Sequence, residues 1–248
     1  MKNQFHILNG DALLQHFPKS IVGERIVARE CMVDGPVEGS DLQQLFNARA
    51  KFLSGNYGGT VKEYFEKVVT EFEKIRAIEG NSDIHLWFED DLFCQVNFWF
   101  ISYLISTGMK DVHVYLVRPK VHTQYGFGGL TESQLVEIFE QKREIKELDK
   151  IGHLWNAYQH DDTNELLNIS SALANTYPFI EDAVNAHMDR IPTDGNLGRP
   201  INTIRSIMRE LNTQEFSIVF REFCKREPIY GFGDLQIKRL FDKIIETD

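Results

Sequence analysis

Four short segments in the first half of the chain have the character of β-strands, and helical patterns separate the later ones. Each is rich in β-branched or aromatic residues and is bounded by Gly, Asp, Asn or Pro. The segments are 5–8, 25–29, 83–88 and 112–117, and the helical patterns are 41–53, 60–77 and 91–106. Strands that alternate with helices pair in parallel, because each crossover returns the chain to the same end of the sheet. We therefore expect an α/β fold, with a parallel Rossmann-like sheet in residues 1–120.

The segment 91–106 is apolar on nearly every side of the helix that it predicts. Its longest apolar run, 92–105, covers 14 residues and includes Gln95 and Asn97. A membrane-spanning helix needs roughly 20 such residues, so a buried helix at the centre of the core is the better interpretation. The first residues of the chain lack the apolar stretch of an export signal. We therefore expect no membrane association and a cytoplasmic location.

After residue 119 we expect no further strands, only amphipathic helices. These cover 131–143, 148–158, 163–174 and 179–190, with Thr131 as a cap of the first, and then 200–211, 214–226 and 235–246. The Pro- and Gly-containing stretch 192–198 is the best domain boundary in the sequence. The expected domains are a sheet domain (1–120), a helical extension packed on it (121–194) and a three-helix, helix-turn-helix-like domain (195–248).

Two loops in the helical part are nearly identical. One is Tyr-Gly-Phe-Gly-Gly at 125–129, and the other is Tyr-Gly-Phe-Gly-Asp at 230–234. Neither carries the Lys-Ser/Thr of a P-loop or the third glycine of a dinucleotide fingerprint. We interpret both as structural turns whose likeness reflects coincidence or shared turn geometry. The sequence contains no Gly-x-Ser-x-Gly and no His-Glu-x-x-His motif.

The charge of the chain disfavours broad electrostatic binding to nucleic acid or to an anionic membrane. The formal net charge is −10, from 27 Lys and Arg against 37 Asp and Glu. Residues 195–248 hold nine basic against eight acidic side chains, a net of +1, so residues 1–194 carry −11. A helix at 214–226 or 235–243 could present basic residues to DNA, but this balance is thin for a DNA-binding domain. The three cysteines are far apart and odd in number, which indicates reduced thiols.

Polar residues follow each of the four predicted strands. They are Asn9, Gly10 and Asp11 after the first, Glu30, Asp34 and Gly35 after the second, Glu89, Asp90 and Asp91 after the third, and Arg118 after the fourth. The carboxyl ends of parallel strands lie at one edge of a sheet, and ligands of open parallel sheets bind there. We therefore expect these side chains to line one cleft. His6 is an additional candidate because it lies close to Asn9 in the sequence.

Each of these residues also has a purely structural interpretation. Asp11 and Asp91 precede helices and are suited to N-capping, and Gly10 is suited to a tight turn. Arginine side chains at the strand ends could merely neutralise the acids in a structural ion-pair network. Glu30 is harder to explain in this way, because a carboxylate that ends an apolar strand is poorly hydrated.

Two chemistries are open to such a set of carboxylates. Asp11, Glu30 and Glu89 could hold Mg²⁺ or Mn²⁺, whose preference for oxygen ligands suits phosphate-bearing substrates. Alternatively, two of the carboxyl groups of Asp11, Glu30, Glu89 and Asp91 could act as general acid and base, provided that their surroundings separate their pKa values. The spacing of the residues favours neither chemistry over the other.

Three segments of the sequence belong to a recognisable pattern. They are His-Ile-Leu-Asn-Gly-Asp-Ala-Leu at 6–13, Ile-Val-Ala-Arg-Glu-Cys-Met-Val-Asp-Gly-Pro-Val at 26–37 and Leu-Trp-Phe-Glu-Asp-Asp-Leu-Phe-Cys-Gln at 86–95. Together they resemble a bacterial family known only as a domain of unknown function, labelled eighteen thirty-five. The likeness extends through 128–130, 154–158 and 195–199, and the C-terminal part is similar to the companion domain of that family.

The resemblance covers most of the chain and implies a set of signature positions. These are Asn9, Asp11, Arg29, Glu30, Gly35, Glu89, Asp91 and Gln95. Residues 200–203, Pro-Ile-Asn-Thr, depart from the Thr-Glu pair that usually opens the next helix in the family. The family brings no established activity, so the resemblance sharpens the site and not the function.

The leading hypothesis from the sequence is a protein that binds a small phosphate-bearing or nucleotide-like ligand in an acidic cleft, with Mg²⁺ and with metal-assisted hydrolysis as the candidate reaction. The four acids would hold the metal or act as acid and base. The ligand-binding set is His6, Asn9, Gly10, Arg29, Asp34, Gly35, Gln95 and Arg118, with the arginines meeting anionic groups. The alternative is a regulatory protein whose C-terminal helices contact DNA or another protein.

Overall fold

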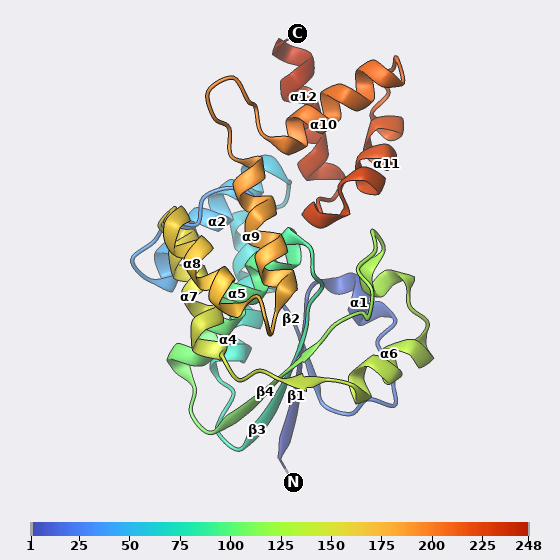
Figure 1. Ribbon diagram of the computed structural model, residues 1–248. Coiled ribbons are helices and arrows are strands. Elements are labelled where there is room, and N and C mark those ends of the chain that lie inside the picture. Colours follow the sequence, from blue (N-terminus) through green and yellow to red (C-terminus); the bar gives the residue numbers. More distant parts are fainter. Residues whose placement is uncertain (1, 248) are drawn as a thin grey trace.

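Four parallel strands and one short antiparallel strand form a single sheet in the order β2-β1-β3-β4-β5 (Figure 1). The structure is a computed structural model and describes residues 2–247. The strands are β1 (Asn3–Leu8), β2 (Glu24–Val27), β3 (Ser82–Trp87), β4 (Val112–Val117) and β5 (Arg143–Glu144). In the parallel part, Leu8 is in register with both Val27 and Trp87. The prediction of an α/β fold with a parallel sheet is confirmed.

The expectation that strands stop after residue 119 is wrong, because β5 follows and closes one edge of the sheet. It pairs antiparallel with β4 and places Arg143 opposite Leu116. Helix α6 (Glu132–Glu140) therefore ends earlier than the predicted residue 143. Both residues of β5 are exposed and charged, so the segment lacks the apolar alternation by which strands are recognised.

The predicted helices are present, with shifts of a few residues at their ends. They are α2 (Leu42–Asn56), α3 (Val61–Tyr64), α4 (Thr70–Arg76), α5 (Leu92–Gly108), α7 (Leu148–Gln159), α8 (Thr163–Leu173), α9 (Pro178–Arg190), α10 (Arg199–Glu210), α11 (Phe216–Arg226) and α12 (Asp234–Thr247). The predicted helix 60–77 is interrupted by a π-helical turn, η1 (Phe65–Val69). Two 3₁₀ turns are η2 (Gly126–Gly129) and η3 (Pro228–Tyr230). Helix α1 (Asp11–Gln15) is the helix expected next to Asp11, and its five residues are too few for a periodic pattern to give its bounds.

Helices cover both faces of the sheet, because successive residues of each strand point to opposite sides. Leu8, Trp87 and Val117 pack with residues of α1 and α6, while their neighbours in the strands pack with α5. Figure 1 shows α1 and α6 on one side of the sheet and α5, α7, α8 and α9 on the other. The strand ends therefore lie between two helical layers.

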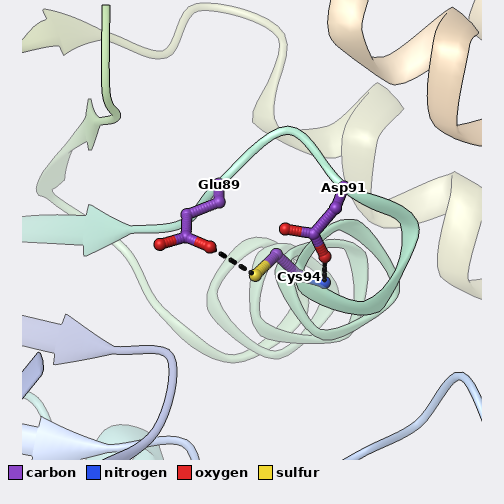
Figure 2. A group of neighbouring side chains, drawn as sticks. All are labelled: Glu89, Asp91 and Cys94. Carbon is purple, nitrogen blue, oxygen red and sulfur yellow. Dashed lines mark hydrogen bonds between the residues drawn. The ribbon is translucent and has the colours of Figure 1, made fainter. Parts of the chain in front are cut away.

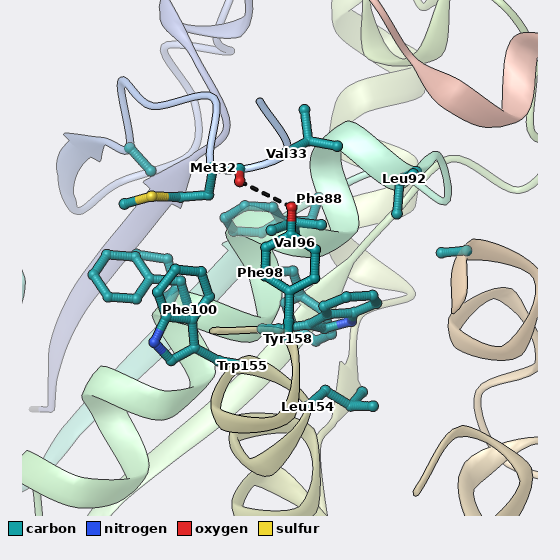
Figure 3. Packing of buried hydrophobic residues seen from close by; sticks show 14 of the residues in the cluster. Met32, Val33, Phe88, Leu92, Val96, Phe98, Phe100, Leu154, Trp155 and Tyr158 are labelled. Atoms are coloured by element: carbon teal, nitrogen blue, oxygen red, sulfur yellow. Dashed lines mark hydrogen bonds between the residues drawn. The ribbon is translucent and has the colours of Figure 1, made fainter. Parts of the chain in front are cut away.

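Helix α5 is the centre of the larger core, as its uniformly apolar sequence predicts. It packs against α7 and α9, and the rings of Phe100 and Trp155 lie 4.6 Å apart between their centroids. Tyr158 of α7 donates its hydroxyl hydrogen to the carbonyl oxygen of Met32 at 3.2 Å (Figure 3), which ties the loop after β2 to this core. Within residues 2–247 no helix is both long enough and apolar enough to cross a membrane.

The last three helices, α10, α11 and α12, pack against one another beyond the C-terminal ends of the strands (Figure 1). We call them the C-terminal helices. Arg199 joins them to the rest of the chain, because it lies 3.1 Å from Asp189 of α9 as well as 2.8 Å from Glu227, which precedes η3. Arg239 of α12 forms an ion pair with Asp34 in the loop after β2. Ion pairs thus hold the C-terminal helices over the edge of the sheet where the strands end.

Candidate functional site

A cavity of about 400 Å³ lies between this edge of the sheet and the C-terminal helices. On the sheet side it is lined by Asn9 after β1, by Ala12 of α1, and by Glu89 and Asp91 after β3. The strand order reverses between β1 and β3, since β1 continues to β2 on one side and β3 to β4 on the other. Ligands of open parallel sheets bind at such a reversal. The cavity therefore occupies the position that the topology marks for a ligand.

Aromatic rings make up much of the cavity wall. They come from the start of α5, from the loop before α6 and from the C-terminal helices, and they are Phe93, Tyr125, Phe127, Phe220, Phe223 and Phe232. Cys224 and Glu227 also contribute, and none of the described lining residues is Lys or Arg. The cavity thus combines carboxylates with apolar rings.

Glu89, Asp91 and Cys94 form the polar cluster of the cavity (Figure 2). One ligand atom from each of the three lies within 4.8 Å of the other two. Cys94 donates its thiol hydrogen to Glu89 Oε2 at 3.7 Å, and its backbone N–H donates to Asp91 Oδ1 at 2.9 Å. Figure 2 shows the second oxygen of Asp91 turned toward the other two side chains.

Burial gives these groups unusual acidities. The pKa of Glu89 rises from 4.5 to about 7, first because of desolvation and then because of the charge of Asp91. Desolvation likewise raises the pKa of Asp91 from 3.8 to about 6. The pKa of the Cys94 thiol is raised well above 9.0, so this group stays protonated at neutral pH. Two carboxyl groups with pKa values near neutrality can exchange protons with a ligand.

The start of α5 positions this cluster. Asp91 is the N-cap of α5, which confirms the structural interpretation of this residue. Gln95, one turn later, donates its Nε2 hydrogen to the backbone oxygen of Glu89 at 2.7 Å. Asn97 donates to Asn9 Oδ1 at 2.9 Å, and Asn9 in turn donates to the sulfur of Cys94 at 2.8 Å. The ends of β1 and β3 are therefore fixed relative to each other by side chains of one buried helix.

The two Tyr-Gly-Phe-Gly loops meet at this cluster, one on each acid. Gly126 has φ of +48° and Gly231 has φ of +60°, a left-handed conformation that favours glycine. A Cβ atom at Gly126 would overlap the carboxylate of Glu89, and one at Gly231 would overlap that of Asp91. Phe127 also donates its backbone N–H to Glu89 Oε1. Both loops are turns, as predicted, but their positions at one cavity give the repeated motif a common role.

Glu30 lies in a buried ion pair rather than in the cavity. Both of its carboxylate oxygens accept from Arg49 of α2, at 3.0 and 2.7 Å, and the two side chains are 1% and 0% exposed. The hydroxyl of Tyr64 adds a third bond at 2.6 Å. Arg49 also donates to the carbonyl oxygens of residues 31, 34 and 36, so the pair shapes the loop after β2. The sequence indicated that this carboxylate would be poorly hydrated. In the structure an arginine from α2, distant in the sequence, neutralises it.

The structure does not bring the predicted metal ligands Asp11, Glu30 and Glu89 together. At the exposed start of α1, the N–H of Arg29 Nε donates a bifurcated hydrogen bond to both carboxylate oxygens of Asp11, at 2.9 and 2.8 Å. Each of the first two acids thus has its own arginine, which neutralises it where it lies. Glu89 instead clusters with Asp91 and Cys94. Asp11 is also not an N-cap, because Gly10 occupies that position of α1.

Other predicted ligand-binding residues take part in structural contacts. Arg118 binds both oxygens of Asp90 and stacks on Phe179, with 4.6 Å between its guanidinium carbon and the ring centroid. Asp34 accepts from Tyr57 and Arg239. At Gly35 a Cβ atom would collide with the ring of Phe52, and φ is +85°. The arginines predicted to meet anionic groups are therefore engaged with acids of the chain itself.

His6 belongs to an aromatic stack on the α1 and α6 side of the sheet. It is fully buried, its ring stacks on His85 with 4.8 Å between centroids, and it receives a hydrogen bond from Trp87 Nε1 at 3.2 Å. Its Nε2 lies 3.1 Å from the carbonyl oxygen of Val22. Desolvation lowers the pKa of His6 to about 4, so the ring is neutral at pH 7. Both ring nitrogens are thus occupied within the fold.

Of the predicted set, Asn9, Glu89 and Asp91 line the cavity, Gln95 holds the backbone of Glu89, and Gly10 is the N-cap of α1. The lining residues from the C-terminal helices, among them Phe223, Cys224 and Glu227, were not predicted. The signal that could have found them is the second Tyr-Gly-Phe-Gly loop, which repeats the first. Comparisons with family models, with curated proteins and with solved structures found no match. The resemblance to family eighteen thirty-five therefore stays a prediction from the quoted segments.

Proposed function

We propose that the chain binds a small molecule in the cavity at the strand ends, and that Glu89 and Asp91 act on it as an acid–base pair. The observation that carries the proposal is the cavity itself, about 400 Å³ at the reversal of strand order, with two carboxyl groups of raised pKa in its wall. Ligand pockets are concave and mostly apolar, with a few convergent polar groups. This cavity has that composition.

The two acids would share a proton near neutral pH. Their pKa values of about 7 and about 6 mean that one group is largely protonated when the other is largely ionised. The protonated group can donate to a leaving or carbonyl oxygen, and the ionised group can accept a proton from a ligand or from water. The Cys94 thiol, which donates to Glu89, would hold that carboxylate in one orientation.

The residues that line the cavity disfavour the phosphate-bearing or nucleotide-like ligand that the sequence suggests. A phosphate would meet three carboxylates, since Glu227 joins Glu89 and Asp91, and no described basic side chain lines the cavity. Such a ligand would need Mg²⁺ to offset the repulsion. Mg²⁺ prefers six oxygen ligands, and a cluster of two carboxylates and a protonated thiol supplies few of them. Mg²⁺-assisted hydrolysis is therefore the weaker form of the proposal.

We infer that the C-terminal helices serve to cover the cavity and not to bind DNA. The strand order is one of the two common doubly wound orders, apart from the antiparallel edge strand, which favours our assignment of a Rossmann-like sheet. Several basic residues that a DNA contact would use are paired with acids of the chain, namely Arg226 with Glu210 and Glu222, Lys225 with Glu222, Lys238 with Asp242 and Arg239 with Asp34. We therefore favour a ligand in the cavity over DNA on the helices.

A cavity-filling variant tests the proposal. Ala12 is exposed and lines the cavity from α1, so Ala12→Trp should block the cavity without disturbing the core. Gln15→Trp, on the same helix and away from the cavity, is the control. Thermal-shift titrations with nucleotides, sugar phosphates and amines, each with and without Mg²⁺, should reveal saturable binding that Ala12→Trp abolishes and Gln15→Trp retains.

Mass spectrometry of the incubated ligand tests the acid–base part. We expect a product with the unchanged protein and none with Glu89→Gln. If no compound binds, or if Ala12→Trp leaves every response intact, the cavity is not a binding site. If a bound ligand is recovered unchanged with the wild-type protein, the acid–base role is wrong.

A further inference from the structure

Most carboxylates at this edge of the sheet and in the helices over it have an arginine of their own. Five of them form ion pairs with arginines from elsewhere in the chain, namely Asp11, Glu30, Asp34, Asp90 and Glu227. For the buried ones, Glu30 and Glu227, such pairing is necessary, because an isolated buried charge is strongly unfavourable. The pairing also shows that arginine is plentiful at this edge of the sheet.

Glu89 and Asp91 are the exceptions, and both face the cavity. Neither takes part in an ion pair among the described residues, although Asp91 is only 4% exposed. Their hydrogen-bond donors are neutral: the backbone N–H groups of Phe127 and Cys94, and the Cys94 thiol. Among the described residues the chain thus gives these two neighbouring carboxylates no ion-pair partner, although His122 acts electrostatically on Glu89, and both face a cavity that an outside molecule can enter.

The cavity is shaped for an organic cation rather than for a bare ion. Its volume of about 400 Å³ suits a molecule of several heavy atoms. The aromatic rings in its wall offer π faces, which attract ammonium and guanidinium groups and also pack against flat apolar bodies. An anionic ligand would meet three carboxylates and no basic side chain among the described lining residues, with only neutral polar groups such as Asn9, Thr123 and Gln124 beside them.

We propose that the cavity takes a small organic cation, a primary ammonium or a guanidinium group on a flat apolar body. The cationic group neutralises Glu89 and Asp91, and the body packs against the aromatic wall formed with Phe127 and Phe223. This inference rests on the proposed function, because it names the class of ligand that the same cavity binds. It adds that the cavity selects its ligand by the positive charge of the ligand and not by recognising a phosphate group.

Three compounds with nearly the same skeleton test the choice of charge. They are 2-phenylethylamine, 2-phenylethanol and phenylacetate, which are cationic, neutral and anionic at pH 8. Isothermal titration of the full chain detects millimolar dissociation constants. We expect the amine to bind at least about tenfold more tightly than the alcohol, as a desolvated charge pair with cation–π contacts implies. Phenylacetate should show no saturable heat.

Conservative variants locate the bound cation. Glu89→Gln keeps an acceptor for the backbone N–H of Phe127, and Asp91→Asn keeps a good N-cap for α5. Each should weaken the amine at least about tenfold and leave the alcohol unchanged. Asp90→Asn removes a charge from the same loop on the side that faces Arg118, so it should leave amine binding unchanged. Circular dichroism confirms that each variant is folded.

The outcomes separate this inference from the proposed function. If the alcohol or phenylacetate binds as tightly as the amine, and Ala12→Trp removes that binding, the cavity is a binding site but the cation assignment is wrong. If MgCl₂ alone binds and Glu89→Gln removes it while the amine gives no heat, the carboxylates serve a metal and the inference fails. If neither these compounds nor any nucleotide binds, the proposed function fails with it.

Discussion

Replacing Glu89 with glutamine should stabilise the protein by an amount that grows as the pH rises. In the folded chain the pKa of this carboxyl is raised from 4.5 to about 7, because desolvation and the charge of Asp91 disfavour its ionised form. The unfolded chain therefore loses the proton at a lower pH than the folded chain does. Stability from this group is fully present below pH 4.5 and is lost as the pH rises through about 7. Glutamine has no proton to lose and avoids that loss.

The size of the effect follows from the two pKa values. Proton linkage gives a loss of about 0.2 kcal/mol at pH 4, about 2 kcal/mol at pH 6 and about 3 kcal/mol at pH 8. The amide oxygen of glutamine can still accept from the backbone N–H of Phe127, so the variant keeps that hydrogen bond. The difference in unfolding free energy between Glu89→Gln and the wild type should therefore follow this series.

Urea unfolding at the three pH values, followed by circular dichroism, measures the difference. Glu137→Gln is a suitable control, because Lys120 holds the pKa of that exposed carboxyl below its usual value and the variant should gain nothing as the pH rises. A difference between Glu89→Gln and the wild type that is independent of pH would refute the reasoning, as would one that shrinks toward pH 8. Either result would mean that Glu89 is well solvated in the folded chain.

Three further substitutions have expected outcomes that are measurable by urea unfolding. Gly126→Ala should destabilise the protein by about 1 to 2 kcal/mol or more, because φ is +48° and the added Cβ meets a carboxylate, whereas Gly128→Ala, with open space around it, should change little. Arg49→Met should destabilise the fold by about 3 to 5 kcal/mol, because it leaves the buried carboxylate of Glu30 unpaired; a loss below 1 kcal/mol would contradict a structural role for that pair. Burial lowers the pKa of His85 from 6.5 to about 3. The unfolded chain therefore binds a proton below pH 6.5 that the folded chain does not bind, and at pH 5 this difference lowers the free energy of unfolding by about 2 kcal/mol. His85→Gln should lessen the loss between pH 7 and pH 5 by that amount, and an unchanged loss would show the ring to be protonated in the fold.

Short-range patterns in the sequence predicted the strands and the helix that position the candidate site. The four parallel strands, the buried helix α5 and the cap at Asp91 all follow from short-range features, such as β-branched runs, uniform apolarity and a carboxylate before a helix. The prediction that polar strand ends share one edge holds because parallel strands leave no alternative. Glu89 and Asp91 were found by that reasoning alone.

The partners of the acids could not be found in this way. Arg49 lies in the middle of α2, and nothing in its spacing from Glu30 indicates that the two side chains meet in the core. The cavity wall formed by Phe223 and Gly231 depends on where the C-terminal helices dock, which is a property of tertiary packing. The repeated Tyr-Gly-Phe-Gly sequence pointed to this part of the wall. Its role depends on Glu89 and Asp91, which lie opposite the two loops.

The order in which the cavity wall is synthesised has a consequence for when the proposed binding can begin. Residues 220–233, which complete the wall, leave the ribosome after all the others that line it. Until then the growing chain lacks the loop of Gly231, which packs on the carboxylate of Asp91, and a carboxyl group open to water has no reason to keep a proton at neutral pH. A chain interrupted after α10 would therefore lack the enclosed space and the loop that covers Asp91. The ligand binding that we propose should accordingly begin only in ribosome-bound chains from which α11 and η3 have emerged.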